Sequence, residues 1–308
     1  MSLPLILALA MLLDACAGEP RWLWDHLPHP TVLMGRAVQW SDRTLNTGPY
    51  QRLKGVGAML GLGLGAVVLG LVLQELGGIL QVIIAAILLA QKSLVTHVRA
   101  VGNALRMSLG DGRRAVAMIV GRDTSAMQPP DVARAAIESA AENLSDGVIA
   151  PAFWFLVAGL PGLFLYKITN TADSMIGHRT PRHEAFGWAA ARFDDLLNLI
   201  PARLTCVIIA LPGGYGGSWA AIRDDAMQHR SPNAGWPEAA MARALNVALS
   251  GPRSYGGTKQ EFPYVNAGGR RDIGADDIDT ACRVLWRSWA VALAVVIAIL
   301  VVQAVTHP

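Results

Sequence analysis

Hydrophobic residues fall in long runs that polar segments separate. A helix needs about 20 mostly apolar residues to cross the hydrocarbon core of a bilayer, and five runs approach or reach that length. They cover residues 3–17, 55–73, 77–90, 147–168 and 290–305, and a shorter apolar segment covers residues 196–211. Only residues 74–76 separate the second run from the third, which predicts a tight turn between two helices. The pattern predicts an all-α, polytopic membrane helical bundle that forms a single integral-membrane domain over residues 1–308.

The lysines and arginines predict how these runs are oriented. Both ends of the chain and the turn at residues 74–76 have no basic residue, and all 26 lie in residues 18–54, 91–146, 167–203 and 215–287. Because basic residues concentrate on the cytoplasmic side of membrane proteins, these polar blocks are expected there. The cytoplasmic segment predicted from the third block is 169–203.

Residues 147–168 then have to enter and leave the bilayer on one side. The Gly159-Leu160-Pro161-Gly162 sequence at the middle of this run offers a turn, so we expect a re-entrant or half-buried helical hairpin. Irregular backbone at that depth is tolerated only inside protein or beside water. The hairpin should therefore pack within the bundle and bring residues 138–146 near residues 170–177. The full spans are then 3–17, 55–73, 77–90 and 290–305.

The composition agrees with a membrane protein and excludes several other classes. Of the 308 residues, 53% are hydrophobic and only 16% are charged, compared with about 25% charged in soluble domains. A net charge of +3 is too small for a polybasic nucleic-acid binder. Cys16, Cys206 and Cys282 are too far apart to predict a zinc site, and no disulfide is expected.

Three glycines recur every four residues in the second run. At Gly57, Gly61 and Gly65 another helix could approach the backbone closely, so we interpret the stripe as a packing surface and as a candidate contact for a homo-oligomer.

The first polar cluster precedes the predicted hairpin. Helical spacing puts Arg134, Glu138 and Glu142 on one face, and Asn143 and Asp146 follow directly. A solvated face with an Arg134–Glu138 pair is one interpretation. The other is a platform for a hard divalent cation such as Mg²⁺, which prefers oxygen ligands.

Two further clusters follow the hairpin. Asn170, Asp173 and Ser174 share one side of a helix, and a carboxylate at the membrane edge is costly unless it has a function or acts as a cap. In the next segment an Arg192–Asp195 pair has a simple structural explanation, which leaves Asp194 unexplained.

Two loops have the composition of anion-binding segments. Residues 229–238 lead into a helix whose N-terminal N–H groups favour a negative ligand. Residues 251–257 combine glycines with Arg253, which suits phosphate, although plain turn chemistry explains both loops as well. Neither loop matches a P-loop.

An ordered series of motifs resembles the adenosylcobinamide-phosphate synthase family, CobD/CbiB, over nearly the whole chain. Glu19 stands where that family more often has Asp, which keeps a carboxylate. The motifs are Asp14 with Gly18-Glu19-Pro20-Arg21, His29-Pro30 with Met34-Gly35, Val120-Gly121-Arg122-Asp123-Thr124, Glu138-Ser139 with Ala141-Glu142-Asn143 and Asp146-Gly147, Asn170-Thr171 with Asp173-Ser174-Met175, Phe186-Gly187-Trp188-Ala189-Ala190-Ala191-Arg192 with Asp194-Asp195, Ser231-Pro232-Asn233-Ala234-Gly235-Trp236-Pro237-Glu238, and Gly251-Pro252-Arg253-Ser254-Tyr255-Gly256-Gly257.

The resemblance implies a multi-pass inner-membrane ligase of cobalamin biosynthesis whose active site faces the cytoplasm. Such an enzyme joins adenosylcobyric acid to (R)-1-aminopropan-2-ol phosphate, or a related amino alcohol, through an amide bond, with ATP and Mg²⁺. The need for ATP is chemically reasonable, because at neutral pH a carboxylate and an ammonium stay ions until the carboxyl group is activated.

Within that resemblance the residue roles are our hypothesis. His229 is expected to deprotonate the amine, since an unperturbed imidazole has a pKa of about 6.5, with Arg192 and Asp195 as further catalytic residues. The expected metal ligands are Glu138, Glu142, Asp146, Asp173 and Asp194. The expected substrate and phosphate contacts are Arg122, Asn143, Asn170, Ser174, Arg230, Asn233, Arg253, Ser254 and Tyr255.

Two other functions remain as alternatives. An intramembrane prenyltransferase also holds Mg²⁺ with acidic motifs at the mouth of a helical bundle, but the motifs here are only about twenty residues apart. A corrinoid or metabolite transporter fits the apolar composition, but transporters usually place polar sites between internal repeats at the midplane, and this sequence has no visible repeat.

Overall fold

The computed structural model describes residues 1–213, 219–255 and 258–306, without the side chains of Arg21, Ser254, Tyr255, Thr258 and Lys259. Helices dominate the described residues, and the strands there are short, which confirms the all-α fold class. The chain forms two compact units, which we describe separately. The first comprises Met1–Ala90, Ala150–Leu199 and Leu293–Pro308, and the second comprises Gln91–Ile149 and Ile200–Ala292.

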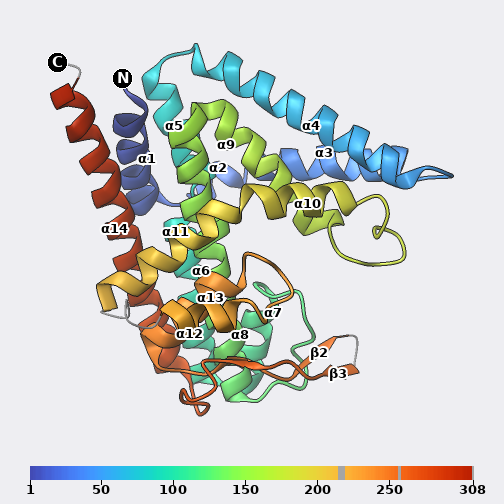
Figure 1. Cartoon of the computed structure of the whole chain (residues 1–308), viewed down its shortest axis with the longest axis vertical. Helices are drawn as coiled ribbons and strands as arrows, with labels where there is room; N and C mark the ends of the chain where they lie inside the picture. The colour runs from blue at the N-terminus through green and yellow to red at the C-terminus, as the bar shows by residue number, and fades with distance from the viewer. Residues whose placement is uncertain (214–218, 256–257, 307–308) are drawn as a thin grey trace. The chain divides into compact units, whose positions relative to one another are not determined.

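The first unit contains most of the long apolar helices (Figure 1). Its elements are α1 (Leu3–Ala17), α2 (Arg21–Trp24), α3 (Pro30–Leu45), α4 (Gln51–Gln74), α5 (Gly78–Leu88), α9 (Ala150–Ile176), α10 (Trp188–Leu197) and the last part of α14 (Ala275–Thr306).

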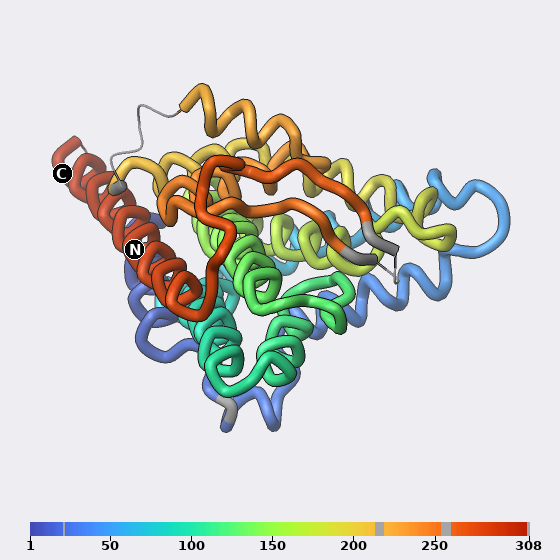
Figure 2. Tube along the Cα trace, turned by 90° about the horizontal axis from the view of Figure 1, so that it is seen from below, coloured from blue at the N-terminus to red at the C-terminus, as the bar shows by residue number. Residues whose placement is uncertain are grey.

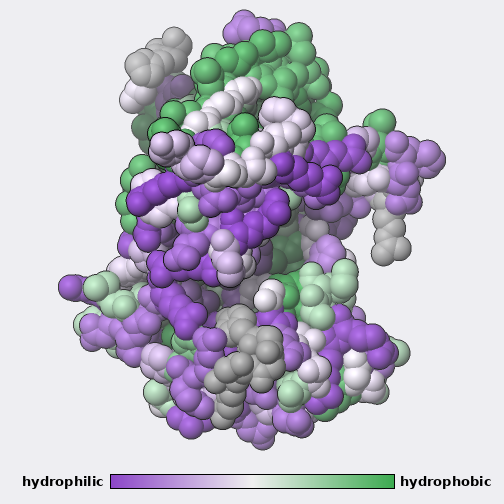
Figure 3. Space-filling model, turned by 90° about the vertical axis from the view of Figure 1, so that its right-hand side faces the viewer, coloured by the Kyte–Doolittle hydropathy of each residue, from purple (hydrophilic) through white to green (hydrophobic). Residues whose placement is uncertain are grey.

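Four helical stretches of the described residues are long and apolar enough to cross a membrane, and the chain is therefore a membrane protein. On α4 the side chains of Leu60 and Leu64 are 70% and 66% exposed, as expected of a helix that faces lipid. Hydrophobic surface gathers at the top of Figure 3, where Figure 1 places α4, α5 and the bend of α9. The four stretches are Gln51–Gln74, Gly78–Met107, Pro129–Ile176 and Ala275–Thr306, and Leu3–Ala17 and Leu199–Ala210 are shorter apolar helices.

The helix α9 is interrupted where the sequence offers a turn. Ala158 and Gly159 have non-helical backbone angles, and Gly159 has a φ of 63°, a conformation that glycine adopts without a steric penalty. The two halves of α9 run in opposite directions on either side of this break (Figure 1). The break lies in the Gly159-Leu160-Pro161-Gly162 sequence, and entry of this hairpin into the bilayer from one side stays a prediction.

Close packing of α4 against α9 requires a glycine at one position. A Cβ atom on Gly70 would lie 2.6 Å from the Cα and N atoms of Pro161, so only glycine fits without a shift of the backbone. Gly57, Gly61 and Gly65 differ, because a Cβ atom there would meet no described atom within 4 Å. No helix of the described residues therefore packs closely on this stripe, and its use as a contact for another helix in a homo-oligomer stays a prediction.

The second unit is built around α8, whose residues from Val132 to Ala141 are all buried. Three helices, α6, α7 and α13, and the strand β1 pack against it. Its elements are α6 (Gln91–Met107), α7 (Leu109–Ala117), α8 (Pro129–Leu144), the π-helical η1 (Ser145–Ile149), most of α11 (Leu199–Ala210), η2 (Leu211–Gly213), α12 (Trp219–Ala226), α13 (Gly235–Leu245) and the first part of α14.

The segment between α13 and α14 leaves the helices and returns, as the orange part of the tube in Figure 2 shows. Strand β1 (Leu249–Ser250) pairs antiparallel with β4 (Tyr264–Val265), so that Leu249 lies opposite Val265. Strand β2 (Arg253–Tyr255) pairs antiparallel with β3 (Thr258–Gln260). The two strand pairings hold the described residues on both sides of this segment against each other.

Replacement of Gly70 by alanine is expected to destabilise the protein. Overpacking against Pro161 should cost about 1–3 kcal/mol, which a thermal unfolding curve of the detergent-purified protein would measure as a lower midpoint. Gly65→Ala is the matched control, because the same methyl group enters open space and alanine favours a helix. Equal midpoints for the two variants would contradict the packing.

Candidate active site

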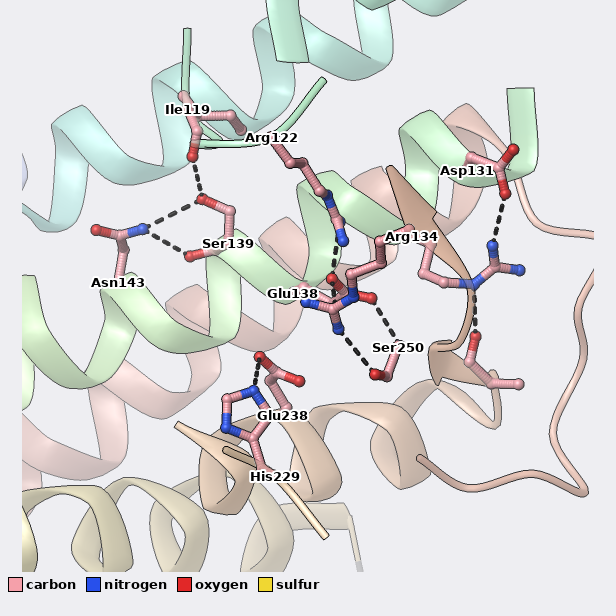
Figure 4. Close-up of polar contacts among 12 residues, drawn as sticks. Ile119, Arg122, Asp131, Arg134, Glu138, Ser139, Asn143, His229, Glu238 and Ser250 are labelled. Atoms are coloured by element: carbon pink, nitrogen blue, oxygen red, sulfur yellow. Dashed lines mark hydrogen bonds and ion pairs between the residues drawn. The ribbon is translucent and has the colours of Figure 1, made fainter. Parts of the chain in front are cut away.

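A buried carboxylate lies at the centre of the polar groups of the second unit. Glu138, on α8, accepts a hydrogen bond from Arg122 Nη2 at 2.8 Å and lies 3.3 Å from Arg253 Nη2. The backbone N–H of Ser250 donates to its other oxygen at 2.6 Å. Figure 4 shows Arg122 and Ser250 beside Glu138. A buried charge is costly unless it is paired and hydrogen-bonded, and here both conditions are met.

The expected pair between Arg134 and Glu138 is not formed. Arg134 Nη1 donates to Asp131 at 2.9 Å, and Arg134 Nε donates to the carbonyl of Ala248 at 3.1 Å (Figure 4). The prediction is wrong because helical spacing only brings two side chains within reach. Partners from distant segments satisfy both groups, and Arg134 thereby attaches the chain before β1 to α8.

A second buried carboxylate, Glu238 on α13, faces the ring of His229. Glu238 Oε1 lies 3.7 Å from His229 Nε2, whereas its Oε2 atom is buried without a hydrogen-bond partner among the described residues. The N–H of Ser231 donates to the other ring nitrogen, Nδ1, at 3.0 Å. This geometry favours the neutral ring that carries its proton on Nε2, directed at Glu238 (Figure 4).

Burial shifts Glu238 and His229 toward their neutral forms. It raises the pKa of Glu238 well above the usual value, and the negative charges of Glu138 and Glu142 act in the same direction. Burial also lowers the pKa of His229, and Arg253 and Arg230 contribute to that shift. Sequence reasoning treated Glu238 only as the start of a helix. Its position in a motif beside His229 was the available signal.

His229 and Glu238 line a cavity of about 230 Å³, whose walls carry both acidic and basic side chains. Phe262 lies beside the two guanidinium groups, 4.4 Å from Arg230 and 5.5 Å from Arg253, and so helps to hold them. The lining residues are Glu142, Asp225, Gln228, His229, Arg230, Glu238, Ser250, Arg253, Phe262, Pro263, Tyr264 and Val265.

Another cavity, of about 280 Å³, shares Ser250 and Arg253 with the first. Its charged residues include Arg122 and Arg134 together with Asp123 and Asp131. Arg253 thus lies on the walls of two cavities, and its Nη2 donates to the hydroxyl of Ser250 at 2.8 Å.

The first unit contains a polar network around Asp194. This buried carboxylate accepts hydrogen bonds from Asn170 at 3.3 Å and Asn198 at 3.0 Å, and Tyr166 donates to Asn198 at 3.1 Å. Burial, followed by the charge of Asp173, raises the pKa of Asp194 to about 7. Asp194, which the sequence left unexplained, thus has Asn170 and Asn198 as hydrogen-bond donors.

Several other candidate residues have partners within their own unit. Arg192 and Asp195 form the simple pair at 3.1 Å, and Ser174 donates to the carbonyl of Asn170. Asn143 donates to Ser139, and Asn233 accepts from Arg203 at 2.7 Å. The side chains of Ser254 and Tyr255 lie outside the described residues.

The predicted site is thus distributed over two units. The second unit brings Arg122, Glu138 and Arg253 together, and it places Glu142, His229 and Arg230 around the first cavity with Arg253. Asp146 lies in η1 of the same unit. Asn170, Asp173, Ser174, Arg192, Asp194 and Asp195 belong to the first unit, so convergence of the two groups stays a prediction.

A magnesium site made by the protein alone is not found in the described part of the chain, where no three His, Cys, Asp or Glu side chains form a group that could hold a metal ion. Arginines and an N–H group already engage Glu138. The five acids of the predicted platform belong to both units, so that platform stays a prediction. Mg²⁺ often uses only one or two carboxylates together with substrate phosphates.

Comparison with known proteins places the chain among proteins of one pathway. The family model described as CobD/Cbib protein matches residues 7–285. The cobalamin biosynthesis protein CobD of Brucella anthropi is 48% identical over 96% of both chains. The CobD proteins of Rhizobium meliloti and Rhodobacter capsulatus are 50% and 46% identical, over 93% and 86% of this chain and 94% and 88% of their own. No solved structure matches the chain.

Replacement of Glu138 by glutamine is expected to destabilise the second unit strongly. The variant keeps the shape of the side chain but leaves two buried guanidinium groups without their carboxylate, and breaking a buried pair costs about 3–5 kcal/mol. The midpoint of thermal unfolding in detergent measures the loss. Asp111→Asn, which breaks the exposed Asp111–Arg114 pair, should leave the midpoint unchanged. The prediction fails if both variants behave alike.

Proposed function

The chain belongs to the CobD/CbiB family of cobalamin biosynthesis proteins, and from this premise we propose that it catalyses formation of an amide bond. The acid is the free propionate of adenosylcobyric acid, and the amine is (R)-1-aminopropan-2-ol phosphate or a closely related amino alcohol phosphate. The product is adenosylcobinamide phosphate. The reaction consumes ATP with Mg²⁺, and the active site faces the cytoplasm from the inner membrane.

The first cavity is the observation that carries this proposal. An amino alcohol phosphate has a cationic end and an anionic end only a few bonds apart. Glu142 and Glu238 would receive the ammonium group, while Arg230 would receive the phosphate group. Planar guanidinium groups donate paired hydrogen bonds to phosphate oxygens. A cavity of about 230 Å³ is smaller than the roughly 300–1,000 Å³ of sites for drug-sized ligands, as a small amine substrate requires.

Glu238 is the side chain best suited to take the proton of the amine. The amine attacks only in its neutral form, so a base has to accept a proton from the ammonium group. His229 Nδ1 already accepts the N–H of Ser231, and Nε2 faces Glu238. We therefore assign His229 to orient Glu238 and assign the proton to the carboxylate, whose Oε2 atom has no described partner. An ammonium group beside Glu238 favours the ionised form of this carboxylate. Transfer of a proton from the ammonium group returns Glu238 to the neutral form, which burial favours.

Arginines at the two cavities suit the negative charges that the reaction involves. The carboxylate would take the terminal phosphoryl group of ATP, with ADP as the leaving group, and attack by the neutral amine on the resulting acyl phosphate would then expel phosphate. Arg122 and Arg134 at the second cavity would hold phosphate groups of the nucleotide, and Arg253 on the shared wall would stabilise the negative charge that develops when the amine attacks. Family membership favours this ligase over the prenyltransferase and the transporter.

The direct test incubates the purified protein with adenosylcobyric acid, ATP, Mg²⁺ and aminopropanol phosphate, and follows the corrinoid by mass spectrometry. Product with the mass of the amide is expected. Omission of ATP, or chelation of Mg²⁺ with EDTA, should abolish the product. Consumption of an isoprenyl diphosphate, or vesicle uptake of an unchanged corrinoid, would instead support one of the alternatives.

Removal of the proton acceptor should affect kcat more than KM. Glu238→Gln is expected to lower kcat by about 10²–10⁴-fold, the usual contribution of a general base, and His229→Gln should have a smaller effect. Because the pKa of Glu238 is raised and the base has to be ionised, activity of the native protein should fall with decreasing pH already well above pH 4.5. Asp224→Asn, on the exposed side of α12, is the control. Native kcat in Glu238→Gln would exclude the role.

Loss of a guanidinium group should weaken recognition of the phosphate end selectively. Arg230→Gln removes a charged hydrogen bond worth about 1.5–3 kcal/mol, so KM for aminopropanol phosphate should rise roughly 10–100-fold, whereas KM for unphosphorylated aminopropanol should stay nearly constant. Equal changes in the two KM values would show that Arg230 does not contact the phosphate.

A further inference from the structure

A basic groove lies in the first unit, and the proposed ligation does not use it. It has a volume of about 500 Å³ and is formed by the first turn of α4, the segment 177–187 and the start of α10. Three arginines and one acidic residue line it. The lining residues are Arg52, Gly177, Arg179, Pro181, Glu184, Ala185, Trp188, Ala191 and Arg192.

Two of the three arginines of this groove have no carboxylate partner among the described residues. Arg192 pairs with Asp195, but no carboxylate of a described residue pairs with Arg52 or Arg179. The guanidinium carbon of Arg52 lies 3.8 Å from the ring centre of Trp188, which holds this cation in place without neutralising it. Like charges that line one groove repel each other, so an anion bound between them would be stabilised.

Tight packing makes the walls of the groove a built feature. A Cβ atom on Gly55 would lie 2.0 Å from the carbonyl oxygen of Phe186, so the N-terminal part of α4 is in direct contact with the segment 177–187. Arg182 in this segment donates to Asp42 of α3 at 2.7 Å, and its carbonyl accepts from Asn46 at 3.0 Å. These contacts therefore hold the walls of the groove in place without a ligand.

The position of the groove along α4 indicates the chemistry of that ligand. Arg52 lies in the first turn of a helix that is long and apolar enough to cross the membrane. The exposed Trp188 is of the type that gathers at the membrane–water interface. Phosphate groups of lipids occupy that level, and basic residues next to a span attract anionic lipids.

We propose that this groove binds a phosphate ester, through Arg52 and Arg179 with support from Arg192. The phosphate comes either from the headgroup of an anionic phospholipid or from a soluble nucleotide. Two guanidinium groups without carboxylate partners supply the hydrogen-bond donors, and Trp188 fixes one of them. All lining residues of the groove belong to the first unit, and none of them lines the substrate cavity of the proposed ligation.

Native mass spectrometry of the detergent-purified protein tests the proposal. The native protein is incubated with phosphatidylglycerol, with phosphatidylcholine or with ATP, and the bound adducts are compared with those of Arg52→Gln/Arg179→Gln. At least a tenfold loss of one anionic ligand is expected in the double variant, since two charged hydrogen-bond donors are removed. The control Arg114→Gln/Arg283→Gln removes the same charge from exposed positions of the second unit and should bind normally.

The two sources of phosphate are distinguished by competition. Retention of phosphatidylglycerol in the presence of excess ATP assigns the site to a lipid headgroup, and displacement by ATP or by inorganic phosphate assigns it to a soluble phosphate. Arg179→Gln alone, which breaks no described contact, serves if the double variant does not fold. Equal binding by native protein and Arg179→Gln, or no binding of either anion by native protein, would overturn the proposal. Because binding is the readout, failure here leaves the ligation assay unaffected.

Discussion

The pairing of one buried carboxylate determines how the second unit is built. Glu138 on α8 receives Arg122 from the chain before α8, and Arg253 and the Ser250 N–H from the β1–β2 segment. A charge in the interior is tolerated only when such partners surround it, so these segments cannot shift independently. Because Ser250 and Arg253 line both cavities, the same constraint fixes the shape and charge of the candidate active site.

The candidate active site combines groups from elements of different kinds. Helices α8 and α13 supply Glu142 and Glu238, whereas loops and a short strand supply Arg230 and Arg253. The helices hold the acids in fixed places, and Phe262 helps to hold the guanidinium groups. The result is a small space with opposite charges on its walls, which suits a zwitterionic substrate better than a purely anionic or purely apolar one.

Features that depend on neighbouring residues could be predicted, whereas contacts between segments far apart in the chain could not. The all-α membrane class, the break near Gly159 and the family were all visible in the residues. The Arg134–Glu138 pair was wrong, because α8 is almost completely buried and partners more than 100 positions away satisfy both side chains. Glu238 was missed as a site residue, since an acid in the first turn of a helix has an ordinary explanation as a helix-start residue. Only its burial beside His229 marks it as a candidate site residue.

The sequence by itself determined which segments are helical and apolar, where α9 breaks, and to which family the chain belongs. These properties depend on residues near one another in the chain or on the order of motifs along it. The tertiary structure alone decided which charges meet, that Gly70 and not the stripe at Gly57, Gly61 and Gly65 packs closely within the chain, and that Asp194 lies in a network with Asn170 and Asn198. The physical reason is that burial and charge pairing depend on segments far apart in sequence, whose meeting no local pattern encodes.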